Sequence, residues 1–187
     1  MKMQLFSGLL ALVIIVAYPQ IAEAAAASVT VPVQFFIAST DQITVTLASG
    51  SQYISTTTTA RVDFNSTNGS DLWKNASVGA TTQGVTTPIL TIDNTGTTSG
   101  VLNISTQAAP STLLSGCVDL RYNFTQQASC SNLATGLTST ALSTAPVTLD
   151  ASFTPADALL CLWLWGNFSA CTTGTGNLNL YINYTGA

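Results

Sequence analysis

The 187-residue chain lacks most of the side chains on which enzymes depend. It has no histidine, four Lys and Arg, and eight Asp and Glu, of which Glu23 is the one glutamate. Histidine and glutamate are the most frequent general acids, general bases and metal ligands. We therefore expect that the protein is not an enzyme and that it has no catalytic residue, no cofactor and no bound metal.

Basic residues are too few to form a surface for nucleic acid. They are Lys2, Arg61, Lys74 and Arg121, and they are scattered along the chain. A nucleic-acid-binding surface needs clustered Lys and Arg to neutralise phosphates, so we expect no nucleic-acid partner. The hydrophobic content of 47% nevertheless predicts a folded core in a chain that has the length of one domain.

Long hydrophobic runs are scarce as well, and the one candidate lies at the N-terminus. Leu5 to Tyr18 is free of charge and is followed by Ala22-Glu23-Ala24, an A-x-A cleavage pattern. This arrangement is typical of a secretory signal peptide, whereas a membrane-spanning helix needs about 20 apolar residues. We expect residues 1–24 to be removed and the mature chain to be secreted without a membrane anchor.

An archaeal type IV pilin leader is the alternative for this segment. Such a protein keeps its apolar run as a filament-core helix. Pro19 and the strand-like sequence that begins at Ser28 disfavour a long helix that continues from the leader.

Apolar and polar residues alternate with a period of two in most of the remaining chain, which predicts β-strands. Clusters of Gly, Asn, Ser and Thr separate the alternating segments at a spacing that is typical of a β-sandwich. The expected fold is all-β, an immunoglobulin-like or jelly-roll-like sandwich. The candidate strands are Val29–Ile37, Ile43–Leu47, Ala60–Phe64, Val85–Asp93, Val101–Ser105, Val118–Phe124, Val147–Phe153, Leu159–Trp165 and Leu178–Tyr184.

Tryptophan is rare, and two of the three copies lie in one strand. Leu159–Trp165 is apolar on both faces, which predicts a central strand that is covered on both sides. Trp73, Trp163 and Trp165 could stack on sugars, but packing in a core is the commoner use of tryptophan.

Asparagine is abundant in the pattern N-x-S/T, which is the acceptor for N-linked glycans. In the candidate strands these asparagines alternate with apolar residues, so they fall on the face that we expect to meet solvent. We predict N-linked glycans on several of these sites. The seven sequons are at Asn65, Asn68, Asn75, Asn103, Asn123, Asn167 and Asn183.

The four cysteines of an exported chain indicate two disulfides, for which three pairings exist. Sequential pairing is the simplest, with Cys117 bonded to Cys130 and Cys161 bonded to Cys171. It requires residues 165–167 to turn a hairpin. A metal site is disfavoured because the chain has no C-x-x-C pair and no histidine.

Three features occur together: a secretory leader, an alternating apolar strand at the mature N-terminus (SVTVPVQFFIA) and Thr- and Asn-rich strands with many sequons. The segments ITVTLASGS (Ile43–Ser51) and LTIDNTGTTSGVLNI (Leu90–Ile104) are similar in style to sandwich strands of archaeal thread and bundling-pilus subunits. The chain thus resembles these surface filament proteins. They in turn resemble TasA-like biofilm fibres and, more remotely, chaperone–usher pilins.

This resemblance implies donor-strand complementation, in which the N-terminal strand of each subunit completes a sheet of the next. The domains would be a signal peptide (1–24), a donor strand (25–37) and a β-sandwich head (38–187). The partners would be identical subunits in a cell-surface filament with a role in adhesion or biofilm. In the donor strand, the residues expected to fill the neighbour's groove are Val29, Val31, Val33 and Phe35.

Two other functions fit the same sequence. The first is a surface-layer or cell-wall glycoprotein domain whose N-terminal strand pairs within its own sheet. The second is a secreted carbohydrate-binding module that uses the tryptophans.

Overall fold

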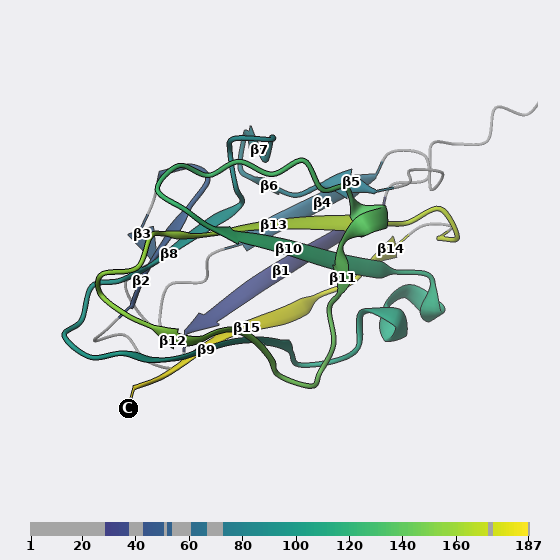
Figure 1. Cartoon of the computed structure of the whole chain (residues 1–187). Helices are drawn as coiled ribbons and strands as arrows, with labels where there is room; N and C mark the ends of the chain where they lie inside the picture. The colour runs from purple at the N-terminus through teal and green to yellow at the C-terminus, as the bar shows by residue number, and fades with distance from the viewer. Residues whose placement is uncertain are drawn as a thin grey trace, which may run out of the picture.

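The computed structural model describes residues 29–37, 43–50, 52–53, 61–66, 73–171 and 174–186 (Figure 1). The predicted leader, residues 1–24, lies outside them. The described residues form β-strands and two short 3-10 helices, η1 (Pro110–Gly116) and η2 (Gly136–Thr138), so the predicted all-β class is confirmed. No helix among these residues is both long and apolar enough to cross a bilayer.

One sheet contains the first and the last strands of the described chain. Its order is β12-β9-β15-β1-β4-β6-β7, and β14 also pairs with β1. The bounds are β1 (Val29–Ile37), β4 (Arg61–Ser66), β6 (Ser77–Val78), β7 (Thr81–Thr82), β9 (Gly100–Thr106), β12 (Val147–Phe153), β14 (Gly174–Thr175) and β15 (Leu178–Gly186). All its pairings are antiparallel except those of β1 with β15 and β14.

The other sheet has the order β11-β10-β13-β8-β2-β3, with β5 beside β13. Its strands pair antiparallel throughout. The bounds are β2 (Ile43–Leu47), β3 (Gln52–Tyr53), β5 (Lys74–Asn75), β8 (Leu90–Asn94), β10 (Asp119–Gln126), β11 (Thr140–Ala141) and β13 (Leu160–Asn167).

The two sheets pack face to face around one hydrophobic core. The core takes residues from both, among them Val45 and Leu162 of the second sheet and Phe64 and Ile182 of the first. Figure 1 shows β10 and β13 lying over β1 and β15. In β2, β8 and β15 buried residues alternate with half-buried ones, as the period-two pattern predicts.

Strand β13 departs from this alternation because both of its faces are covered. Every residue from Leu160 to Gly166 is buried. The prediction of a central, covered strand over Leu159–Trp165 is therefore confirmed. The strand is longer than predicted, since it runs through Gly166 to Asn167, where the sequence suggested a hairpin turn.

Gly166 serves close packing in this strand, not a turn. A Cβ atom at this position would lie 2.5 Å from Cζ of Phe168 and 3.0 Å from Cδ1 of Phe64. The Phe64 and Phe168 rings pack against each other with centroids 6.0 Å apart. Glycine is required here because no other residue leaves room for both rings.

Candidate functional site

The predicted donor strand, β1, lies in the middle of its sheet with a paired strand on each side. On one side it pairs antiparallel with β4, from Val29 opposite Ser66 to Gln34 opposite Arg61. Val31 and Val33 stand opposite Phe64 and Val62, and both of these β4 residues are fully buried.

On its other side β1 pairs in parallel with the C-terminal strand. Val33 and Phe35 stand opposite Leu178 and Leu180 of β15, which are 2% and 0% exposed. Val29 stands opposite Gly174 of β14. The backbone of β1 thus has partners in three strands of the same chain. Three of the four predicted donor residues, Val31, Val33 and Phe35, are in register with core residues of the neighbouring strands.

Asn103 and Asn183 lie where the period-two pattern predicts, whereas Asn123 contacts a loop through its Nδ2, which donates to Asn132 Oδ1 at 3.2 Å. Asn103, Asn123 and Asn183 are half-buried. Their flanking residues Leu102, Ile104, Tyr122, Ile182 and Tyr184 are buried, and Phe124 is half-buried. Asn103 and Asn183 stand directly opposite each other in β9 and β15. Their glycosylation stays a prediction.

The other sequons lie in different surroundings. Asn75 is exposed in β5, and Asn167 is half-buried at the end of β13, where its Oδ1 accepts a hydrogen bond from the Ser169 amide at 3.0 Å. Asn65 lies in β4 opposite Thr30. Asn68 lies outside the described residues.

The predicted sequential disulfide pairing is wrong. The bonds join Cys117 to Cys171 and Cys130 to Cys161, with Cα–Cα distances of 5.1 and 5.7 Å. All four cysteines are used, and the two bonds indicate an oxidising compartment.

Strand pairing explains this connectivity. β10 and β13 run antiparallel over eight residue pairs, from Asp119 opposite Asn167 to Gln126 opposite Leu160. Cys161 is the second residue of β13, and a strand rises about 3.3 Å per residue, so Asn167 at the end of the strand lies about 20 Å away from it. A disulfide tolerates a Cα–Cα distance of about 7 Å at most. Each cysteine of the β13 segment therefore bonds to the β10 segment beside it.

The bond between Cys130 and Cys161 holds a loop, residues 127–139, over the outer face of the second sheet. Cys161, Trp163 and Trp165 form a small core on this face, and Cys130, Ala134 and Trp73 pack against it. Trp73 also contacts Gly136 and lies 4.6 Å from the guanidinium of Arg121. The expected use of the tryptophans in a core is confirmed for Trp163 and Trp165, which are 1% and 6% exposed.

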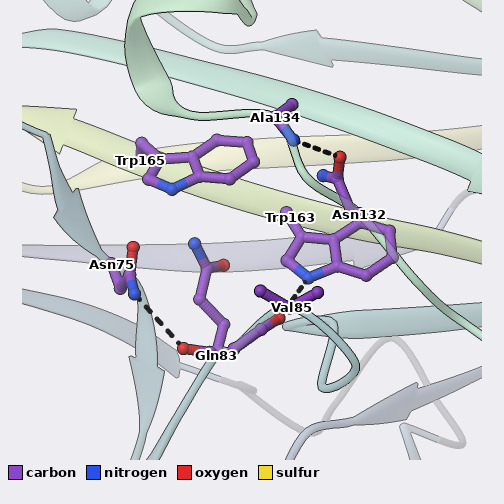
Figure 2. Close-up of a pocket in the computed structure, with 8 residues that line it drawn as sticks. Asn75, Gln83, Val85, Asn132, Ala134, Trp163 and Trp165 are labelled. Atoms are coloured by element: carbon purple, nitrogen blue, oxygen red, sulfur yellow. Dashed lines mark hydrogen bonds between the residues drawn. The ribbon is translucent and has the colours of Figure 1, made fainter.

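A pocket of about 90 Å³ remains between this loop and the sheet (Figure 2). Its lining consists of uncharged residues only: Asn75, Gln83, Gly84, Val85, Asn132, Ala134, Trp163 and Trp165. Trp163 donates a hydrogen bond from Nε1 to the Gly84 carbonyl at 2.7 Å, so its indole forms a fixed wall.

Gln83 closes a gap in the sheet beneath the pocket. Its Oε1 accepts from the Leu164 amide at 2.9 Å, and its Nε2 donates to the Leu164 carbonyl at 2.5 Å. Leu164 lies in β13 between the residues that pair with β8 and those that pair with β5. The Leu164 carbonyl also accepts from the Ala76 amide at 3.3 Å, whereas the Leu164 amide is bonded by the Gln83 side chain. The side-chain amide thus takes part of the role of a neighbouring strand, and Gln83 is 3% exposed.

Asn132 has one polar atom without a partner. Its Oδ1 accepts from the Ala134 amide at 2.8 Å and from Asn123 Nδ2 at 3.2 Å. Its Nδ2 is buried and has no hydrogen-bond partner, and the residue is 8% exposed. The backbone amide of Ala134 can only donate, which fixes the oxygen on that side. Figure 2 shows the nitrogen on the side that faces the two indoles.

The sequence did not point to this pocket. Gln83 and Asn132 lie in segments without periodicity, and no motif marks them. Val85 begins a segment whose alternation predicts a strand, whereas the structure places it in the lining of the pocket. Within the described residues, no group of three or more His, Cys, Asp or Glu is placed to hold a metal ion.

Burial raises the pKa of Tyr122, a core residue of β10 that stands opposite Leu164 of β13. The protonated phenol is uncharged, and removal from water disfavours the charged phenolate.

Comparison of the chain with protein-family models, with curated proteins and with solved structures found no match.

Proposed function

We propose that the protein is a secreted structural subunit of a cell-surface filament, built by donation of β1 from each subunit to the next. The observation that supports this most is the place of β1 in its sheet. The first described strand lies at the centre, between β15 and β4, not at an edge.

Loss of β1 would open the sheet along its middle. β15 and β4 would each expose a row of unpaired backbone groups, because both now bond to β1. Such open edges accept an extended segment from another chain. Buried residues of both neighbours, Val62 and Phe64 in β4 and Leu178 and Leu180 in β15, would lose the strand between them.

The same strand from a second copy can restore the same pairs. A contact of this kind is heterologous, because one subunit offers a strand and the other offers a groove, and its repetition builds an open fibre. Register would be fixed by side-chain alternation, since a slip of one residue would exchange the two faces of the strand. The head would be a sandwich of immunoglobulin-like or jelly-roll-like type, with N-linked glycans on its outer faces and a role in adhesion or biofilm.

A surface-layer or cell-wall glycoprotein domain is the second candidate, and a specific observation favours it. In the single chain β1 pairs with its own β4 and β15. In this alternative the pairing persists in the assembled state. In the filament β1 would make the same contacts with β4 and β15, but β1 would belong to one subunit and β4 and β15 to the next.

A cysteine pair across β1 and β4 tests whether the pairing is within or between subunits. Gln34 and Arg61 stand opposite each other. We expect assembled Gln34→Cys/Arg61→Cys protein, after mild oxidation, to give a ladder of covalent multimers in denaturing, non-reducing gels. A covalent monomer as the sole product would reject donation and support the second candidate.

Two controls define the result. Thr44→Cys/Asp93→Cys joins opposite residues of β2 and β8, both inside the head, and should close within one subunit. The single variant Gln34→Cys should give no ladder. Electron microscopy of the same material must show fibres if the ladder reports filament assembly.

A further inference from the structure

The tryptophan pocket, defined by the eight lining residues given above, lies in the most apolar part of the described surface. Within the described residues, the exposed large hydrophobic side chains are Val85, Leu133 and Leu137, which are 53%, 86% and 70% exposed. Val85 lines the pocket, Leu133 lies between the lining residues Asn132 and Ala134, and Leu137 follows in η2. Exposed apolar side chains beside a pocket that is lined by both polar and apolar residues indicate a binding surface.

The pocket sets narrow conditions for an occupant. It must be neutral, because no lining side chain carries a charge that could replace lost hydration. It must offer an acceptor oxygen to Asn132 Nδ2, the buried donor without a partner. It must also offer apolar surface to the indoles and Val85.

Size excludes a whole ring within the pocket. The volume of about 90 Å³ is smaller than the roughly 150 Å³ of a protein cavity that binds benzene. Trp163 and Trp165 are buried, so they offer walls and no open face on which a sugar could stack. A small substituent fits where a ring does not.

We propose that this pocket binds the acetamido group of an N-acetylated neutral sugar. The carbonyl oxygen accepts from Asn132 Nδ2, the methyl group contacts the indole walls, and the sugar ring stays at the rim beside Val85 and Leu133. This activity is independent of donation by β1, since none of the eight lining residues belongs to that strand.

An N-acetylated sugar could reach the pocket from two sources. Asn75 is a sequon that itself lines the pocket, so a glycan on this residue lies within reach. A glycan of another molecule or cell is the other source, and it would make the pocket an adhesion site.

The test is a titration of unglycosylated, isotope-labelled protein with N-acetylglucosamine and, separately, with glucose, observed by nuclear magnetic resonance. We expect saturable shifts of the Asn132 side-chain amide and of the indole N–H groups of Trp163 and Trp165 with N-acetylglucosamine. Glucose should bind at least about tenfold more weakly, because it lacks the acetamido carbonyl and methyl group. Equal binding of both sugars, or no shift with either, would overturn the proposal.

Asn132→Asp is the sharpest variant because it keeps both accepted hydrogen bonds and replaces the donor with an oxygen. At neutral pH it should weaken binding of N-acetylglucosamine at least about tenfold. Asn177→Asp, at an exposed position outside the pocket, should bind as the wild type does. Wild-type affinity in Asn132→Asp would reject the role of the amide. If this variant does not fold, Val85→Trp, which narrows the rim and leaves Asn132 in place, must weaken binding in its stead.

Natively glycosylated protein separates the two sources. If the glycan on Asn75 fills the pocket, free N-acetylglucosamine will bind only after Ser77→Ala has removed the sequon and left the lining residue Asn75 in place. If the pocket serves another molecule, the native protein will bind the free sugar directly. Failure of the native protein and of Ser77→Ala alike to bind the free sugar would contradict both sources.

Discussion

The central strands of the two sheets are held in different ways. In β13 the second residue, Cys161, is bonded to Cys130, and in the segment that follows the strand Cys171 is bonded to Cys117. A second small core covers its outer face. β1 is equally central, but all four cysteines are in those two bonds, so no disulfide joins β1 to its neighbours.

In the proposed filament, this difference would separate a permanent half, the disulfide-bonded sheet that stays within its own chain, from β1, which would pass to the next subunit. An element of the β10–β13 pair could enter another subunit only if a disulfide were broken. β1 can leave its sheet with the loss of backbone hydrogen bonds and packing alone. If the predicted cleavage after Ala24 takes place, β1 also lies close to the mature N-terminus and has one connection to the head.

The largest expected effect comes from removal of β1. Deletion of residues 25–35 should abolish fibres and leave a head that unfolds or aggregates, because two open edges and a core groove are exposed. The loss should be comparable to the whole stability of a domain, which is about 5–15 kcal/mol. Thermal unfolding and electron microscopy would measure both outcomes.

Peptide rescue is the control for this deletion. A peptide with the sequence of residues 25–35 should restore cooperative unfolding, whereas a scrambled peptide of the same composition should not. Normal fibres from the deleted chain would show that β1 is not the strand that links subunits.

The next effect concerns the permanent half. Cys130→Ser/Cys161→Ser and Cys117→Ser/Cys171→Ser should each lower the free energy of unfolding by about 4 kcal/mol in the chain-entropy model, because the bonds close loops of 31 and 54 residues. The Cys130→Ser/Cys161→Ser variant alone should also lose the tryptophan pocket, since that bond holds the 127–139 loop. Denaturant unfolding and indole N–H resonances measure the two effects. Loss of the pocket in both variants would show that the bonds are not separate in function.

The long strands could be predicted from the sequence, and the reason is local. Side-chain alternation marks a strand without reference to its neighbours, so Ile43–Leu47 and Val147–Phe153 were predicted with the bounds that the structure has. The two-residue strands were missed because alternation needs more residues than they contain. The first part of the predicted strand Val85–Asp93 lies outside β8, since residues 83–89 form turns and the rim of the pocket.

Disulfide pairing and the pocket depend on which strands are neighbours in the sheets. Side-chain alternation along one segment carries no information about its neighbours. The hairpin at residues 165–167 was expected from the symmetry of Cys161 and Cys171 about Gly166. Glycine is used there for close packing with Phe64 and Phe168. Asn132 is placed by its hydrogen bond with Asn123, and Gln83 by its hydrogen bonds with Leu164. No spacing in the sequence predicts that either pair is in contact.

A smaller effect tests how the fixed sheet is closed beside β13. Gln83→Met keeps the length of the side chain and removes the two hydrogen bonds to Leu164. A buried amide without a partner costs about 1–3 kcal/mol, so the free energy of unfolding should fall by that amount. Gln107→Met, at an exposed residue that bonds to Asn179, should change it by less than about 0.5 kcal/mol. Equal losses in the two variants would contradict the role of Gln83 as a substitute strand.

The smallest effect is seen in alkali and reports whether the core beside β13 excludes water. Burial raises the pKa of Tyr122 above its ordinary value of about 10. The unfolded chain therefore releases this proton first, and the stabilisation that Tyr122 contributes is fully present below about pH 10 and is lost as the pH rises through the folded pKa. The slope is at most about 1.4 kcal/mol per pH unit for one proton. Above pH 10 we expect the free energy of unfolding of Tyr122→Phe to fall less steeply with pH than that of the wild type. Near neutral pH the phenol is protonated in the folded and the unfolded state, so titration of Tyr122 should cause no difference between the two proteins there. Parallel unfolding curves for the two proteins in alkali would mean that water reaches the Tyr122 phenol in the folded state, and that the core between the two sheets is not closed to solvent beside β13.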